Sequence, residues 1–256
     1  DGSQRPLDLT QLSLLISETC KDLSEVKHEL ILQETLRNLY DGMPILEIDK
    51  ALIISARTLV EQDANYTYAT ARFLLRTLYT EALDFLELPT AVYTNNHAGV
   101  YHHYFQHYIK RGVALELLDP QLRSFDLEKL GKALLPERDQ QFTYLSLQTL
   151  YDRYFLHADD VRFELPQAFF MRIAMGLAQQ ESNKEDRAIE FYQLLSSFDY
   201  MASTPTLFNA GTLRPQLSSC FLTTVADDLD QIYSAIKDNA LLSKFAGGLG
   251  NDWTPV

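Results

Sequence analysis

Apolar residues recur at helical spacing along most of the first 200 residues, and this pattern ends at Ser203. Within Asp8–Cys20, for example, leucine and isoleucine return every three or four positions, which places them on one face of a helix. From Ser203 onward, Pro205, Gly211 and Pro215 interrupt any helical pattern, so we expect irregular backbone or strand ends there. The sequence therefore predicts a mainly α-helical chain in which strands begin after residue 200.

The expected helices fall into two groups. The first 85 residues hold four helical segments separated by short turns, one of them at Asp41-Gly42. A second helical group lies within residues 86–200, and a strand, a loop, a strand and a helix are expected after it. The expected helices that the pattern delimits are Asp8–Cys20, Val26–Leu39, Ile45–Asp63, Tyr66–Leu86, Phe142–Phe155, Leu165–Gln180, Arg187–Ser197 and Leu229–Phe245.

Four histidines lie within Thr90–Arg111. His103 and His107 are four residues apart, so a helix places both on one face, as zinc ligands require. A zinc site needs three or four converging ligands, and no third ligand is evident in the sequence. The tyrosines interleaved with these histidines favour a packed amphipathic helix, and we predict no metal site.

Charge and cysteine content limit the function classes. The net charge of -13 argues against general binding to nucleic-acid phosphates, for which a basic stripe is typical. Cys20 and Cys220 are too few for a disulfide-stapled secreted domain. No apolar run of about eighteen residues predicts a membrane span, and no signal-peptide pattern opens the sequence. These features predict a soluble, cytoplasmic protein with no membrane partner.

Cys220 ends the segment Ser203–Cys220, which is rich in hydroxyl side chains, and the strand-like run Phe221–Val225 follows it. Hydroxyl and backbone N–H groups on irregular chain can donate to an anion. A thiol at a strand start beside such groups fits a redox or nucleophilic position. The alternative is a buried structural cysteine, which residue type alone favours.

Eight short motifs, in order along nearly the whole chain, carry a resemblance to a known family. Together they resemble the large (α) subunit of class I ribonucleotide reductase, and their order is more specific than any one of them. The motifs are Y-D-G-M-P-I-L-E-I (Tyr40–Ile48), D-A-N-Y-T-Y-A-T-A-R (Asp63–Arg72), F-T-Y (Phe142–Tyr144), L-P-Q-A-F-F-M-R-I-A-M-G-L-A (Leu165–Ala178), T-P-T-L-F-N-A-G (Thr204–Gly211), Q-L-S-S-C (Gln216–Cys220), D-D-L-D-Q-I (Asp227–Ile232) and F-A-G-G-L-G-N-D-W (Phe245–Trp253).

The resemblance implies three domains. Residues 1–85 resemble an ATP-cone, residues 86–200 resemble the helical N-terminal domain, and residues 201–256 resemble the first strands, loop and helix of a ten-stranded α/β barrel. In the family, the cone binds ATP or dATP, and lysines pair with the phosphates. Gln11 and Glu81 stand at two of these lysine positions, so we interpret this cone as degenerate, with a structural role.

The same resemblance assigns site residues. It implies that Cys220 is one of two redox thiols that form a disulfide with each other, the second lying far downstream. Thr204 and Ser219 match substrate-binding positions, although isolated serines and threonines most often cap turns. Gly247 and Gly248 belong to a G-G-x-G turn after a helix, which fits a substrate loop or, alternatively, a helix C-cap.

Effector binding is implied for Asp227, Asp228 and Leu229, which match the segment that holds a nucleoside triphosphate effector in this allosteric family. The alternative is that the two carboxylates only cap the following helix, where the helix dipole favours them. In the family, that helix also helps to form a homodimer of large subunits.

The resemblance implies that the complete subunit reduces ribonucleoside diphosphates to the deoxyribonucleotides of DNA replication. This chain is expected to hold no cofactor, because a metal-containing small subunit supplies the radical and thioredoxin or glutaredoxin supplies the reducing equivalents. The thiyl-radical cysteine and the second redox cysteine are expected in the C-terminal remainder of the large subunit. We therefore expect this chain alone to be inactive, and the alternative is a non-catalytic helical regulatory or interaction fragment.

Overall fold

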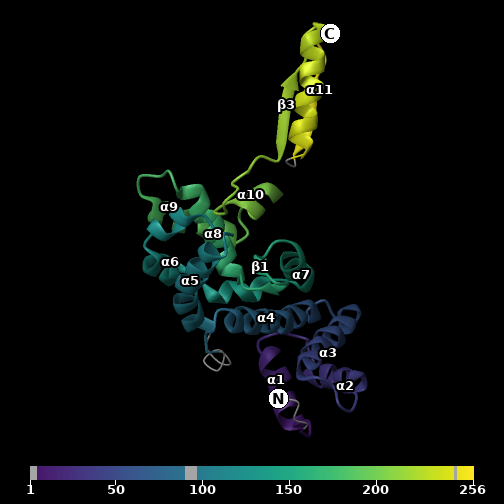
Figure 1. Ribbon diagram of the computed structural model, residues 1–256. Coiled ribbons are helices and arrows are strands. Elements are labelled where there is room, and N and C mark those ends of the chain that lie inside the picture. Colours follow the sequence, from purple (N-terminus) through teal and green to yellow (C-terminus); the bar gives the residue numbers. More distant parts are fainter. Residues whose placement is uncertain (1–4, 90–96, 245–246) are drawn as a thin grey trace. The chain divides into compact units, whose positions relative to one another are not determined.

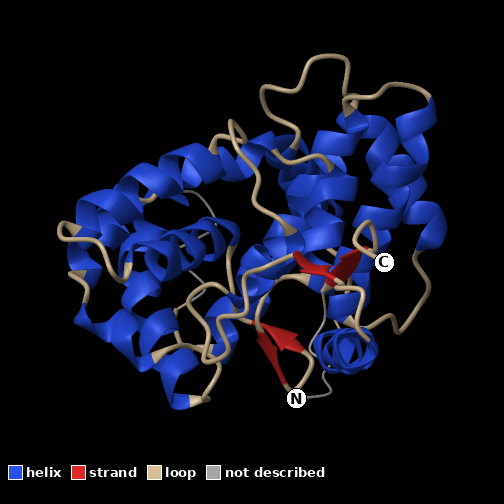
Figure 2. Cartoon of the chain, turned by 90° about the horizontal axis from the view of Figure 1, so that it is seen from above, coloured by secondary structure: helices blue, strands red, loops and turns tan. Residues whose placement is uncertain are grey.

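The computed structural model describes residues 5–89, 97–244 and 247–256, and most of them are helical (Figures 1 and 2). This agrees with the mainly α-helical class that the sequence predicts. Across these described ranges, no helix combines the length and the hydropathy that a membrane crossing needs.

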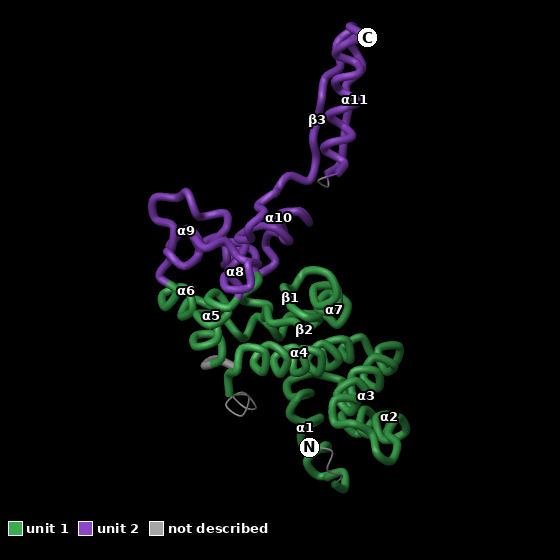
Figure 3. Tube along the Cα trace, in the orientation of Figure 1, with its two compact units in different colours: residues 1–111, 127–169 green, residues 112–126, 170–256 purple. Residues whose placement is uncertain are grey.

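The chain divides into two compact units (Figure 3). Unit 1 comprises residues 1–111 and 127–169, and unit 2 comprises residues 112–126 and 170–256. The units follow from packing alone, whereas the three expected domains, 1–85, 86–200 and 201–256, follow from family resemblance and stay a prediction.

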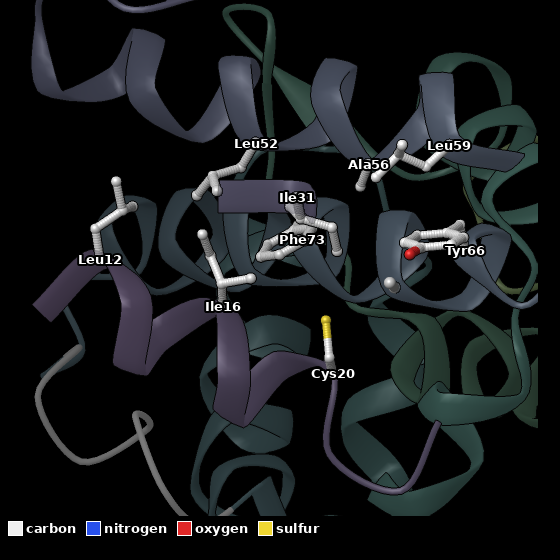
Figure 4. Packing of buried hydrophobic residues seen from close by; sticks show 10 residues of the cluster. Leu12, Ile16, Cys20, Ile31, Leu52, Ala56, Leu59, Tyr66 and Phe73 are labelled. Atoms are coloured by element: carbon white, nitrogen blue, oxygen red, sulfur yellow. The ribbon is translucent and has the colours of Figure 1, made fainter. Parts of the chain in front are cut away.

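Unit 1 begins with the four expected helices, α1 (Leu9–Thr19), α2 (His28–Asn38), α3 (Ile45–Thr58) and α4 (Tyr66–Phe85), with the short 3-10 helix η1 (Leu59–Glu61) after α3. The Asp8 carboxylate begins α1, because its Oδ1 accepts from the backbone N–H groups of Thr10 and Gln11 at 2.9 and 3.0 Å. The four helices share one apolar core, shown in Figure 4, in which residues such as Ile16, Ile31 and Leu52 are almost fully buried. Each such side chain stabilises the module by roughly 2 kcal/mol.

The rest of unit 1 surrounds two buried carboxylates, Asp139 and Glu164. Their partners are the tyrosines of α5, because Tyr101 donates to Asp139 and Tyr108 donates to Glu164. This confirms that the tyrosines of α5 form a packed face. The elements of this part are α5 (His97–Ala114, which continues into unit 2), α6 (Leu127–Ala133), η4 (Pro136–Gln141), α7 (Tyr144–Arg153) and the hairpin of β1 (His157–Ala158) and β2 (Val161–Arg162).

Asp139 makes the stability of unit 1 dependent on pH. Its carboxylate accepts from Tyr79 Oη at 2.5 Å, Tyr101 Oη at 2.8 Å and Gln167 Nε2 at 2.7 Å. Burial nevertheless raises the pKa of Asp139 to about 6, because the three donors offset only part of the desolvation. The folded state therefore binds this proton more tightly than the unfolded state, and the resulting stabilisation is present at about pH 4 and is lost as the pH rises through 6.

We expect Asp139→Asn to flatten this pH dependence. In the wild type, this one group should lower the free energy of unfolding by about 2.5 kcal/mol between pH 4 and pH 7, since one pKa unit corresponds to ~1.4 kcal/mol. Urea unfolding followed by circular dichroism at several pH values measures the slope. Asp152→Asn, on the exposed side of α7, is the matched control. Parallel pH profiles for wild type and Asp139→Asn would contradict the expected role.

Unit 2 continues from the end of α5 and contains a parallel β-α-β arrangement. Strands β3 (Cys220–Thr224) and β4 (Gly248–Asp252) pair in parallel, and α11 (Leu229–Lys244) lies between them in sequence, as a parallel crossover requires. The expected strand after Cys220 and the expected helix from Leu229 are therefore confirmed. The other elements of unit 2 are η3 (Pro120–Ser124), α8 (Pro166–Ala178, which begins in unit 1), α9 (Lys184–Ser196) and α10 (Thr204–Asn209).

Two expectations for unit 2 are wrong. Thr204 does not lie on irregular backbone or a strand end, because it begins the helix α10. Pro205 is compatible with this helix, since the first turn has no intrahelical partner for its missing N–H. Gly248 and Gly250 of the G-G-x-G motif do not form a turn, because both lie within the strand β4.

Candidate functional site

Cys220 is the first residue of β3, and its side chain is exposed. Within the residues that the structure describes the thiol is therefore not buried, and its redox role stays a prediction. Cys220 shares the exposed face of β3 with Leu222 and Thr224, because alternate residues of a strand point to the same side. An accessible thiol can meet a substrate or a redox partner, which a buried thiol cannot.

Gly248 lies opposite Cys220 in the parallel pair. A Cβ atom at Gly248 would stand 3.2 Å from the Cys220 Sγ atom and 3.4 Å from the Ser219 carbonyl oxygen. The Gly248 N–H donates to that same carbonyl at 2.8 Å. Glycine at this position therefore leaves free space beside the thiol, and its N–H holds the backbone of Ser219.

Gly247 likewise leaves space for a neighbouring side chain. A Cβ atom at this position would stand 2.5 Å from the ring of Phe221, the residue after the thiol. The ring thus packs against the backbone of Gly247. The structure brings four predicted site residues together at the start of the β3–β4 pair, namely Ser219, Cys220, Gly247 and Gly248.

Thr204 is exposed at the beginning of α10, and other residues connect this helix to the thiol segment. Asn209 Nδ2 donates to the Gln216 carbonyl at 2.8 Å, and Thr206 Oγ1 donates to the Leu217 carbonyl at 3.2 Å. Both bonds hold the chain just before Cys220.

The buried Arg172 of α8 binds the carboxyl end of α10. The sequence analysis did not identify Arg172 as part of the site. Its side chain is fully buried, and its guanidinium donates to three carbonyls at the end of α10. The sequence places Arg172 within the apolar face Phe169–Leu177, where a charged residue is unusual. This charged residue within an apolar face is the sequence feature that indicates a buried role for Arg172.

Asp228 caps α11. Its Oδ1 accepts from the Gln231 N–H at 3.1 Å, and its carbonyl accepts from the Ile232 N–H at 2.9 Å. Asp227 and Leu229 flank this cap and are exposed. The cap accounts for Asp228 structurally, and effector binding by the three residues stays a prediction.

Cys20 contrasts with Cys220. Its thiol lies in the apolar core of the α1–α4 helices (Figure 4), and burial raises its pKa to about 11 although the nearby Arg72 opposes the shift. The reactive thiolate form is therefore strongly disfavoured at Cys20.

His103 and His107 lie side by side on α5, with ring centroids 4.7 Å apart, and His107 Nδ1 lies 2.9 Å from the His103 carbonyl oxygen. Within residues 5–89, 97–244 and 247–256, no three histidine, cysteine, aspartate or glutamate side chains converge as a metal site requires.

Glu81, which stands at one of the lysine positions of the cone, has a hydrogen-bond partner. Both of its carboxylate oxygens accept from the Tyr151 hydroxyl, at 2.8 and 3.0 Å. Gln11 is exposed in the first turn of α1. The degenerate character of the cone stays a prediction.

Two family profiles match the chain in succession. Residues 140–215 match the profile described as the ribonucleotide reductase all-alpha domain. Residues 218–256 match the profile of the ribonucleotide reductase barrel domain. The β3–α11–β4 arrangement thus belongs to the start of a barrel domain.

Similar proteins extend the match to the rest of the chain. The chain is 43% identical over its full length to the ribonucleoside-diphosphate reductase subunit alpha of Chlamydia muridarum, of which it covers 24%. It is 36% identical to the corresponding subunit of Helicobacter pylori and 33% identical to the large subunit of Danio rerio, covering 31% of each, and these matches include 100% and 98% of the chain. The chain therefore spans about a quarter to a third of the length of these relatives.

Proposed function

We propose that the chain contributes one thiol of a redox pair and part of a substrate site to a ribonucleoside-diphosphate reductase. The premise is that the chain is a relative of the ribonucleotide reductase large subunits and corresponds to an N-terminal portion of them. The observation that carries the proposal is the exposed Cys220 at the start of β3, facing the side-chain-free Gly248. The relatives named above are all reductase subunits, which gives the non-catalytic alternative no support.

Cys220 supplies electrons in this proposal. Two thiols lose two electrons and two protons and become a disulfide, while the 2′-carbon of the ribose loses its hydroxyl as water and gains a hydrogen. The second thiol belongs to the remainder of the large subunit. A radical from a metal-containing small subunit starts the reaction. Thioredoxin or glutaredoxin then reduces the disulfide, which must be accessible, as Cys220 is.

The surrounding residues bind the diphosphate. The exposed hydroxyls of Ser219 and Thr204 are short donors for phosphate or ribose oxygens. The Gly248 N–H already donates to Ser219, so Gly248 contributes space rather than a donor. This space allows the backbone at Gly247 and Gly248 to approach the substrate closely.

The wider assembly is also part of the proposal. Asp227, Asp228 and Leu229 contribute to the binding of a nucleoside triphosphate effector, which makes the enzyme allosteric. Two large subunits form a homodimer that works with the small subunit in the cytoplasm. The cone of residues 1–85 has a structural role.

Substrate binding at this site should protect Cys220 from alkylation. The full-length protein is treated with iodoacetamide, with and without cytidine diphosphate, while ATP is present, and the peptide containing Cys220 is quantified by mass spectrometry. We expect saturating cytidine diphosphate to slow the reaction of Cys220 by about tenfold or more, because a bound diphosphate covers the thiol.

Cys20 is the internal control, since it is buried and its pKa is raised to about 11, so it should react slowly in every sample. Cytidine without phosphates should protect Cys220 much less. An unchanged alkylation rate at saturating cytidine diphosphate would exclude a substrate site beside Cys220.

A further inference from the structure

The buried guanidinium of Arg172 is bound to the end of α10. Its Nη1 donates to the carbonyls of Ala210 at 2.6 Å and Phe208 at 3.4 Å, and its Nη2 donates to the Leu207 carbonyl at 3.2 Å. The last carbonyls of a helix have no intrahelical partner and carry partial negative charge. Arg172 therefore acts as a cationic cap supplied by another helix.

The cap matters because α10 has only six residues. So short a helix does not persist in water without packing. Its N-cap residue, Ser203, makes no capping bond through its side chain. The bonds from Arg172 thus hold the carboxyl end of a helix that is weakly defined at its amino end.

The helix α10 in turn holds the backbone that leads to the thiol. Asn209 and Thr206 donate to the carbonyls of Gln216 and Leu217, which lie four and three residues before Cys220. A continuous set of polar contacts therefore runs from Arg172 through α10 to the chain beside Cys220. All of these residues lie within unit 2.

We infer that Arg172 is a positioning residue for the substrate site. It acts on Thr204 indirectly, through the carbonyls at the far end of α10, and on the backbone before Cys220 through Asn209 and Thr206. This inference rests on the function proposed above. Losing the cap should let both parts of the site shift, so that the substrate binds more weakly.

The expected effect appears in the same alkylation assay. Arg172→Met keeps an unbranched side chain and removes all donors, and we expect the concentration of cytidine diphosphate that half-protects Cys220 to rise about tenfold or more. A tenfold rise corresponds to a loss of ~1.4 kcal/mol in binding free energy. Arg172→Lys keeps the charge and one donor group, so it should restore part of the affinity.

A second variant keeps the inference testable where Arg172→Met does not fold. Asn209→Ala breaks the link to Gln216 and leaves the buried guanidinium in place. It should raise the half-protecting concentration with little change in the thermal unfolding midpoint. Arg187→Met removes an exposed arginine of α9, which pairs with Glu190, and is the matched control that should behave as wild type.

The outcomes separate the inference from the proposed function. If cytidine diphosphate does not protect Cys220 in the wild type, the proposed function fails before any variant is considered. If it protects the wild type and the folded Arg172 and Asn209 variants equally, the positioning role is wrong. A lowered unfolding midpoint of the Arg172 variants, with an unchanged half-protecting concentration and an unchanged KM, assigns Arg172 a structural role only and also overturns the inference.

Discussion

Replacing Cys220 by serine is expected to abolish reduction of cytidine diphosphate by the full-length large subunit assembled with its small subunit. Serine has nearly the same size as cysteine and fits the start of β3, so the local fold should persist. Its hydroxyl cannot be oxidised to a disulfide, and the two electrons for the 2′-carbon are then lacking. We expect a loss of about 1000-fold or more, equivalent to at least ~4 kcal/mol in the barrier.

Deoxycytidine diphosphate formed in the presence of thioredoxin measures this effect. Cys20→Ala is the matched control, because it removes the other thiol of the chain from a core position and should retain activity in folded protein. Unchanged thioredoxin-dependent turnover of the serine variant would refute the redox role of Cys220. A Kd for cytidine diphosphate equal to that of the wild type, measured on the serine variant by isothermal titration calorimetry, together with lost turnover, would separate chemistry from binding.

Replacing Gly176 by alanine is expected to destabilise unit 2 severely. A Cβ atom at Gly176 would lie 2.2 Å from the Gly211 nitrogen and 2.7 Å from the Ala210 carbonyl carbon. Both are backbone atoms, so no side-chain rotation relieves the clash. The free energy of unfolding should fall by about 3 kcal/mol, at the upper end of what overpacking costs, although alanine is the better helix former.

Gly112→Ala is the matched control, since Gly112 also lies in a helix, α5, and within unit 2. There the added atom would meet side-chain atoms only, Cδ1 and Cγ of the buried Leu118 at 2.5 and 2.8 Å, and no backbone atom. A rotamer change of Leu118 can relieve part of this contact, so the loss of stability should be smaller than for Gly176→Ala. Urea unfolding monitored by circular dichroism compares the two variants. Equal stability of both would show that the contact between α8 and Gly211 is not tight.

Helical periodicity predicted most of the fold, because the buried face of an amphipathic helix is visible in its sequence as apolar residues spaced three or four apart. The four helices of residues 9–85 and α11 begin within three residues of the expected positions. The prediction failed at Pro205, where proline was treated as a helix breaker although it occupies the first turn of α10.

The residues that the resemblance assigns to the site were not predicted to be neighbours. Ser219, Cys220, Gly247 and Gly248 lie together at the start of the β3–β4 pair, and their roles stay a prediction. The sequence did not explain why residue 248 is glycine. A side chain at this position would approach the Cys220 thiol on the neighbouring strand, and only the strand pairing shows this contact. The acceptors of Arg172 lie 35 to 38 residues further along the chain, and no local pattern connects the two.

The dependence of α10 on Arg172 also bears on the order in which the protein folds. The helix α8 is long enough and apolar enough to collapse early, whereas six residues with one proline cannot nucleate a helix by themselves. Because α8 precedes α10 in the chain, α8 with Arg172 leaves the ribosome before the six residues of α10 that depend on it. The segment that leads to Cys220 is therefore expected to become ordered only after α8 has formed.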